Sequence, residues 1–159
     1  MTRHLRVTLP TQELSLWEDD RLIGVYKVST ALNGSGSLQG SECTPLGHHR
    51  IRLKIGQGCP LNTVFVGRRP TGEIYTQELG KKFPGRDWIL TRILWLTGLE
   101  PGKNRGGDCD TLKRFIYIHG TADEALLGQP VSHGCIRMKN QDLIEVFNAV
   151  SNNTLVTIE

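Results

Sequence analysis

The sequence has 159 residues, 38% of them hydrophobic, which predicts a single domain over residues 1–159 with a sizeable core. Its net charge is +3, from 19 basic and 16 acidic side chains scattered along the chain, which argues against the concentrated basic face of a nucleic-acid-binding module. Eighteen glycines and seven prolines indicate many turns and favour a mostly β fold.

The N-terminal ten residues contain no long apolar segment, and no window of the sequence approaches the length of a membrane span. If Met1 is the native start, we expect a cytoplasmic protein; if the chain has been trimmed, we expect a periplasmic one. None of the four cysteines, Cys43, Cys59, Cys109 and Cys135, forms a Cys-x-x-Cys pair. We therefore expect free thiols in a reducing cytosol.

The N-terminal half predicts a series of strands. Residues 5–9, 13–18 and 22–29 have strand character, and the last two are expected to form a hairpin. Residues 34–40 are rich in glycine, but their spacing differs from dinucleotide-binding loops and no helix pattern follows, so we expect a flexible loop. Residues 50–55 alternate in polarity, which predicts a strand with one buried face.

The middle of the chain gives weaker patterns. Residues 64–66 and 73–76 are expected to be short strands on either side of a turn at 69–72. The basic stretch 81–86 has two interpretations that the sequence leaves open, a solvated loop tip or a loop that approaches an anionic substrate. Residues 88–96 are rich in β-branched and aromatic side chains, which favours a strand.

The C-terminal part gives the clearest patterns. A polar loop over 98–110 precedes the core strand Phe115–Ile118, which leads directly into His119. Asn140 is expected to cap a helix whose apolar stripe runs to Val150, and residues 155–158 are expected to form a closing strand. We therefore expect a mostly β, single-domain architecture with one C-terminal helix packed on the sheet.

Two segments carry residues suited to nucleophilic catalysis. Twelve residues separate His119 from Ser132, and Ser132-His133-Gly134-Cys135-Ile136-Arg137 follows. A cysteine attacks as the thiolate, and a nearby imidazole promotes its formation by proton transfer or by positive charge. These residue types predict acyl transfer with Cys135 as the nucleophile.

Other residues in the same segment suit the later needs of the reaction. Gly134 permits a tight turn that aims the N–H groups of His133, Gly134 and Cys135 at a developing oxyanion. Arg137 offers a planar guanidinium for a substrate carboxylate. His119 is preferred as the base over His133, because a side chain two residues from Cys135 on an extended backbone runs parallel to the thiol.

Structural alternatives exist for each residue taken alone. A single cysteine is most often a small buried side chain, and a single histidine is most often a hydrogen-bonded structural residue. A zinc site built from His119, His133, Cys135 and Cys109 is a further alternative, although the spacing matches no common zinc pattern. We expect neither a metal nor a cofactor.

The two motifs together resemble the signature of the YkuD-type L,D-transpeptidase catalytic domain. The match consists of Ile118-His119-Gly120-Thr121 and the segment from Ser132 to Arg137, and Thr44-Pro45-Leu46-Gly47 is similar to a Thr-Pro-x-Gly segment of that family. The resemblance runs from about residue 12 to residue 159. It implies a β-sandwich-like domain with its site in a cleft.

The resemblance also implies roles for individual residues. Cys135 would be the nucleophile, His119 the base and the Gly120 carbonyl the group that orients the base, with His133, Gly134 and Cys135 as oxyanion donors. Arg137 would bind a carboxylate of a peptidoglycan stem peptide, and Ser132 is expected in the same substrate-binding part of the site. The scissile bond would join the third, diamino-acid residue of a stem tetrapeptide to the terminal D-Ala.

The acyl acceptor distinguishes the functions that follow. Water would make the chain an L,D-carboxypeptidase acting on soluble muropeptides during murein recycling, which is our first expectation for a cytoplasmic protein. An amine would make it a cell-envelope L,D-transpeptidase that cross-links peptidoglycan. A non-catalytic murein-binding domain is the alternative from another class, and the Cys135–His119 pair argues against it.

Overall fold

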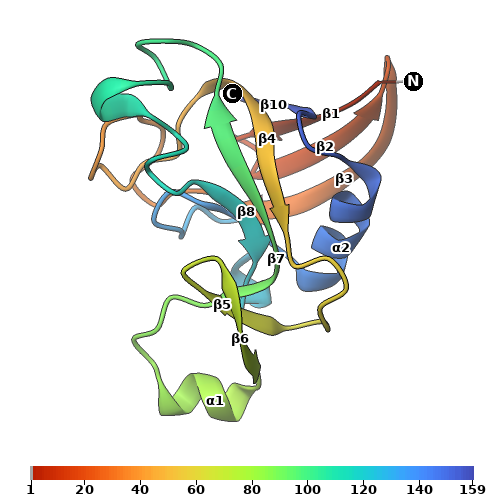
Figure 1. Cartoon of the computed structure of the whole chain (residues 1–159), viewed down its shortest axis with the longest axis vertical. Coiled ribbons are helices and arrows are strands. Elements are labelled where there is room, and N and C mark those ends of the chain that lie inside the picture. The colour runs from red at the N-terminus through yellow and green to blue at the C-terminus, as the bar shows by residue number, and fades with distance from the viewer. Residues whose placement is uncertain (1) are drawn as a thin grey trace.

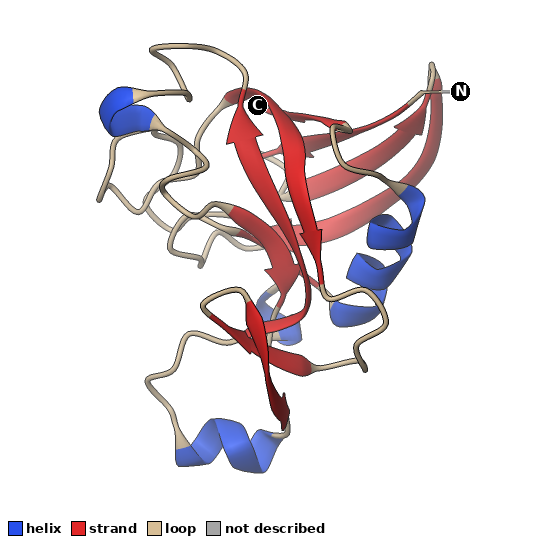
Figure 2. Cartoon of the chain, in the orientation of Figure 1, coloured by secondary structure: helices blue, strands red, loops and turns tan. Residues whose placement is uncertain are grey.

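The computed structural model describes residues 2–159 and contains ten strands and two α-helices (Figure 1, Figure 2). The strands are β1 (Arg3–Thr8), β2 (Glu13–Glu18), β3 (Arg21–Ser29), β4 (Gly47–Ile55), β5 (Thr63–Val66), β6 (Arg69–Ile74), β7 (Ile89–Gly98), β8 (Tyr117–Gly120), β9 (Ile136–Met138) and β10 (Leu155–Ile158). The helices are α1 (Gln77–Lys82) and α2 (Asn140–Ala149), with short 3₁₀ turns at Gly107–Cys109 and Glu124–Leu126. The predicted mostly β fold is confirmed.

All ten strands belong to one sheet that folds back on itself. The order is β4-β10-β1-β2-β3-β9-β8-β7-β5-β6, and β4 also pairs with β7. This extra pairing closes the sheet around a core of buried aliphatic side chains. β5, β6 and α1 lie outside the closed part and form the arm at the bottom of Figure 1.

Helix α2 covers the core beside β7 and β8, as its apolar stripe predicts. Leu143, Val146 and Phe147 are fully buried. The expected cap at Asn140 is wrong, because Lys139 occupies the N-cap position. The Asn140 side chain is instead buried, and it donates to the carbonyl oxygen of Thr121 at 2.9 Å. Asn140 thus ties the start of α2 to the residue that follows β8.

The β5–β6 hairpin differs from the prediction at its turn. Gly67 and Arg68 both have positive φ angles, of 56° and 65°, as a two-residue type I′ turn requires. The expected turn at 69–72 therefore belongs to β6, where Pro70 is tolerated because β6 is the edge of the sheet. The strand expected at 73–76 accordingly ends at Ile74.

Two further elements were not expected. Helix α1 is capped by Thr76, whose hydroxyl accepts from the Leu79 amide at 3.1 Å, and it buries no residue, so it has no apolar stripe to detect. Strand β9 has only three residues, within the segment that carried the chemical motif.

The strand expected to begin at Phe115 begins at Tyr117. Phe115 has a φ of 57°, a left-handed conformation that takes it out of the strand, and its ring is exposed against Trp95. The turn leaves the Phe115 carbonyl oxygen directed at the sulfur of Cys135.

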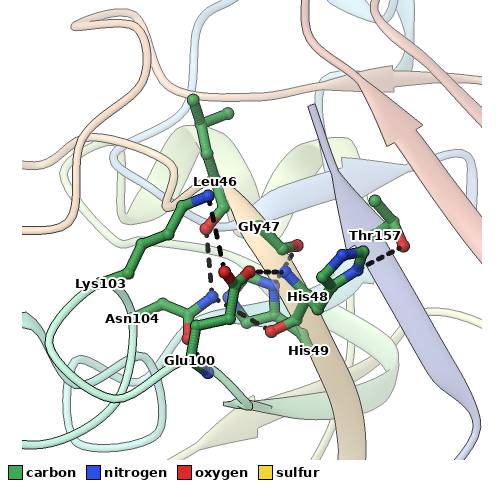
Figure 3. A network of polar contacts seen from close by, with 8 residues as sticks. All are labelled: Leu46, Gly47, His48, His49, Glu100, Lys103, Asn104 and Thr157. Carbon is green, nitrogen blue, oxygen red and sulfur yellow. Dashed lines mark hydrogen bonds and ion pairs between the residues drawn. The ribbon is translucent and has the colours of Figure 1, made fainter.

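A polar network fixes the 98–110 loop to the start of β4 (Figure 3). The Asn104 side chain donates to the carbonyl oxygens of Leu46 and His48, both at 3.1 Å. Glu100 accepts from the His48 amide at 2.7 Å, and its second oxygen lies 3.8 Å from the Lys103 ammonium. The loop therefore holds in place the backbone that immediately follows Thr44.

His49 is fully buried in this network, with its two ring nitrogens hydrogen-bonded to the Gly47 carbonyl oxygen and the Thr111 hydroxyl, both at 3.0 Å. Burial lowers its pKa from 6.5 to about 4. In the unfolded chain the ring takes up a proton near pH 6.5, whereas the folded chain resists protonation until about pH 4.

We therefore expect the free energy of unfolding to fall as the pH is lowered from 6.5 to about 4. The His49 contribution to this loss is about 3 kcal/mol, from the difference between the two pKa values. Urea denaturation at pH 7 and at pH 4 should show a smaller loss in His49→Gln than in the unmodified chain. Equal losses in the two proteins would show that His49 is not the responsible group.

No helix within residues 2–159 is long and apolar enough to cross a membrane.

Candidate active site

The predicted catalytic residues come together where β8 and β9 run side by side. The two strands are parallel, and their register places His119 opposite Arg137 and Ile118 opposite Ile136. Because successive side chains alternate between faces, His119 and Arg137 share one face while the two isoleucines enter the core. Cys135 directly precedes β9, two positions before Arg137, and belongs to the same face.

The sulfur of Cys135 has two main-chain partners. The amide of Tyr117 donates to it at 3.3 Å, and the thiol can donate to the carbonyl oxygen of Phe115, also at 3.3 Å. The sulfur therefore lies in a fixed position beside the start of β8. No hydrogen bond joins it to either candidate histidine in the part of the chain that the structure describes.

The His119 ring is oriented by its own strand. Its Nδ1 lies 2.7 Å from the Gly120 carbonyl oxygen, which can only accept, so Nδ1 carries the proton. The neutral ring then has an unprotonated Nε2, which is the form that a general base needs. This is the orienting contact that the family resemblance implies for Gly120.

One small cavity joins the two residues. It has a volume of about 180 Å³, and His119 and Cys135 both line it. The remaining lining residues are Asp87, Arg114, Phe115, Ile116, Ser132, His133 and Arg137. A substrate carbonyl in this space reaches the sulfur and the base from the same side.

Burial sets the protonation states of Cys135 and His119. It raises the pKa of the Cys135 thiol to about 12, an effect that the Tyr117 amide, Arg137 and Arg114 oppose. It also lowers the pKa of His119, although the Gly120 carbonyl acts in the opposite direction. The site therefore holds a neutral thiol and a neutral imidazole, and not the thiolate that an imidazole near a cysteine would promote.

The loop before β9 is shaped by Gly134, whose φ of 127° is strained for any other residue. Its amide donates to the Ser132 hydroxyl at 3.2 Å, so it is occupied within the loop and is not a free oxyanion donor. The amides of His133 and Cys135 have no such loop partner within residues 2–159. They remain the candidate donors for an oxyanion.

Ser132 lines the cavity, but its hydroxyl forms hydrogen bonds within the loop, whereas the sequence placed Ser132 among the substrate-binding residues. The side chain is 1% exposed, and its hydroxyl donates to the Cys135 carbonyl oxygen at 2.6 Å. Together with the bond from the Gly134 amide, this contact closes the loop around the nucleophile. Ser132 is therefore a positioning residue.

Sequence reasoning assigned no role to three residues around the site. The Thr44 hydroxyl accepts from the Ala31 amide at 3.0 Å and donates to the Gly134 carbonyl oxygen at 2.9 Å. Arg114 donates to the Cys43 carbonyl oxygen at 2.7 Å and lines the cavity. Asp87 also lines it, from the end of the basic stretch. Only Thr44 had a signal, as part of its Thr-Pro-x-Gly segment.

The structure does not support the zinc alternative. Residues 2–159 contain no group of three or more histidine, cysteine or acidic side chains able to hold a metal ion. Cys109 lies in the 98–110 loop, where its thiol faces the Gly106 carbonyl oxygen at 3.3 Å. All four cysteines are free.

Comparison with known families agrees with this geometry. The family model described as the YkuD L,D-transpeptidase catalytic domain matches residues 2–158. Two relatives from Bacillus subtilis are assigned by name to the L,D-transpeptidases. YqjB is 27% identical over 93% of this chain and 66% of its own length, and YkuD is 52% identical over 29% of this chain and 28% of its own.

Solved structures share the fold at low sequence identity. L,D-transpeptidase 3 from Mycobacterium tuberculosis has a TM-score of 0.61 at 15% identity, covering 99% of this chain and 61% of that one. An L,D-transpeptidase from Enterococcus faecium has a TM-score of 0.59 at 13% identity, covering 100% of this chain and 50% of that one. In each of these comparisons the chain spans less than two thirds of the relative's length.

Proposed function

The chain belongs to the YkuD family of L,D-transpeptidase catalytic domains, and on this premise we propose that it cleaves the terminal D-Ala from peptidoglycan stem tetrapeptides through a thioester on Cys135. The observation that carries the proposal is the cavity that Cys135 shares with His119, whose Nδ1 is held by Gly120.

The neutral Cys135 thiol and the neutral His119 imidazole define the first half-reaction. As the Cys135 sulfur attacks the carbonyl carbon before D-Ala, the thiol proton passes to Nε2 of His119. The amides of His133 and Cys135 donate hydrogen bonds to the oxyanion that forms. His119 then returns the proton to the departing nitrogen, the carbon–nitrogen bond breaks, and a thioester remains.

Water is the proposed acceptor, which makes the chain an L,D-carboxypeptidase in murein recycling, located in the cytoplasm. A water needs only the space between Cys135 and His119 in the cavity that both residues line. His119 removes a proton from the water as its oxygen bonds to the thioester carbon. The carbon–sulfur bond then breaks, the sulfur takes the proton from His119, and the tripeptide leaves with a new carboxyl group.

Incubation with a free stem tetrapeptide, with and without an amine acceptor, tests this proposal by the masses of the products. We expect tripeptide and D-Ala under both conditions, and no products from Cys135→Ala. A cross-linked dimer as the main product would instead indicate an L,D-transpeptidase. The absence of turnover with either mixture would favour a murein-binding domain.

Arg137 provides a test of carboxylate binding at this site. It is partly buried beside Cys135 and makes no ion pair with another residue in the range 2–159, so its guanidinium is available to a ligand. We expect Arg137→Lys to weaken substrate binding by about 1–3 kcal/mol, because an ammonium cannot make the bidentate contact. The KM of D-Ala release should rise; lower thermal stability with an unchanged KM would instead indicate a structural role.

A further inference from the structure

The cavity at Cys135 lies beside a second cavity of about 210 Å³. Asp87, His133 and Arg137 line both, so they form the boundary between the two cavities. The second cavity extends between the 84–88 segment and the 121–123 segment. A substrate that places its scissile carbonyl at the sulfur has room to continue into this space.

Asp87 and Arg137 carry opposite charges on this boundary, yet neither has an ion-pair partner within 4.0 Å in the described chain. The neighbouring charges are already occupied. Arg86 donates to both carboxylate oxygens of Glu73, at 2.7 and 3.2 Å. Arg114 donates to main-chain carbonyl oxygens instead. The boundary therefore offers one free carboxylate and one free guanidinium.

The residues on either side of Asp87 are anchored, although its own side chain is exposed. The guanidinium of Arg86 lies 4.4 Å from the centre of the Trp88 ring, and Trp88 packs edge-on against Tyr75 at 5.0 Å. With Arg86 bound to Glu73, these contacts hold the main chain before and after Asp87. Its carboxylate is thus presented to the cavity from a fixed backbone.

We propose that Asp87 is a specificity residue that binds the ammonium of a zwitterionic amino-acid group whose carboxylate is bound by Arg137. The inference rests on the proposed function, and it narrows the substrate to stems whose third residue ends in both an ammonium and a carboxylate, as a diaminopimelate side chain does. A lysine side chain in that position has only the ammonium. A free amino acid that acts as acyl acceptor carries the same two charges, so it is the second ligand that Asp87 and Arg137 could bind.

The charge of Asp87 also acts on the catalytic groups, which provides an internal control. It raises the pKa of both His119 and Cys135. Its removal should therefore not slow alkylation of Cys135 by a small neutral reagent such as iodoacetamide. If Asp87→Asn weakens peptide binding and leaves alkylation of Cys135 intact, Asp87 acts in recognition and the site itself is undamaged.

The experiment compares Asp87→Asn with Asp20→Asn, which changes an exposed acid in the turn between β2 and β3 that lines neither cavity. Binding is measured by calorimetry in a Cys135→Ala background, with a diaminopimelate tetrapeptide and with its lysine analogue. We expect Asp87→Asn to weaken diaminopimelate binding about tenfold. Asp20→Asn should leave it unchanged. The Cys135→Ala protein with Asp87 intact should bind the lysine analogue more weakly than the diaminopimelate peptide.

Equal binding of the diaminopimelate peptide with and without Asp87→Asn would show that Asp87 does not recognise the stem peptide. If transfer to free glycine then falls about tenfold in Asp87→Asn with Cys135 intact, the acceptor is the zwitterion that Asp87 binds. The proposal is overturned when neither measurement changes, when the Cys135→Ala protein binds neither peptide, or when Asp20→Asn has the same effect as Asp87→Asn. Binding that depends on Asp87 without any D-Ala release would contradict the proposed function alone.

Discussion

Replacing Cys135 with alanine is expected to lower the rate of D-Ala release on the order of a thousandfold or more, as loss of a nucleophile does in other enzymes. The Cys135 sulfur lines the cavity, where the Tyr117 amide and the Phe115 carbonyl oxygen hold it in place. Its loss removes the thioester and with it the whole reaction path. Release of D-Ala measured against time, with mass spectrometry of the intact protein, would check both points.

The other three cysteines are matched controls. Cys43 and Cys59 are partly buried and Cys109 is buried, and none of them lines the cavity that Cys135 shares with His119. We expect Cys43→Ala, Cys59→Ala and Cys109→Ala to retain turnover. Near-normal activity in Cys135→Ala, or loss of activity in one of the controls alone, would contradict the assignment of the nucleophile.

Most strands could be predicted because their side chains alternate between the core and solvent. In β2, for example, Leu14 and Leu16 are buried, whereas Ser15 between them is partly exposed. The pattern fails where backbone geometry decides the structure. Phe115 looks like a strand residue but turns into a left-handed conformation, and the hairpin at Gly67-Arg68 depends on two consecutive positive φ angles. A hydrophobic pattern contains no information about such turns.

The position of Cys135 and His119 at one cavity could be predicted, because cysteine, histidine, glycine and arginine in one segment are poor material for a core strand. The residues that support the pair could not. Thr44 is ninety positions from Gly134 and reaches it only because the chain folds back, through a single hydroxyl hydrogen bond. Asp87 lines the cavity directly after the 81–86 stretch. The sequence left two interpretations of that stretch open, a solvated loop tip or a loop that approaches the substrate.

The protonation state of the thiol is the property that residue types alone predicted wrongly. An imidazole near a cysteine favours a thiolate in a solvated site. Here the desolvation of Cys135 has the larger effect. Within residues 2–159 the hydrogen bonds of the sulfur go to the main chain of Tyr117 and Phe115, and none goes to His119. Deprotonation is therefore expected to accompany the attack on the substrate instead of preceding it, which makes the base more important.

Replacement of His119 with alanine is accordingly expected to remove nearly all activity, by a factor similar to loss of Cys135, because base and nucleophile act as a unit. His133→Ala should have a smaller effect, since the contribution expected of His133 comes from its main-chain amide and its side chain is exposed. Steady-state rates of D-Ala release for the two variants would test this order. A greater loss in His133→Ala would show that the base has been assigned to the wrong residue.

The pH dependence of the same proteins distinguishes a neutral His119 base from a thiolate–imidazolium pair that exists before substrate binds. Burial lowers the pKa of His119, so the neutral ring persists below pH 6.5, and kcat/KM should fall only as the pH drops through that lowered value. Iodoacetamide alkylation should accelerate at a higher pH than for an ordinary cysteine, because burial raises the pKa of Cys135 to about 12. His119→Ala should leave that alkylation profile largely unchanged while abolishing turnover. A low-pKa thiol in the unmodified chain that disappears in His119→Ala would instead establish a thiolate–imidazolium pair before substrate binds.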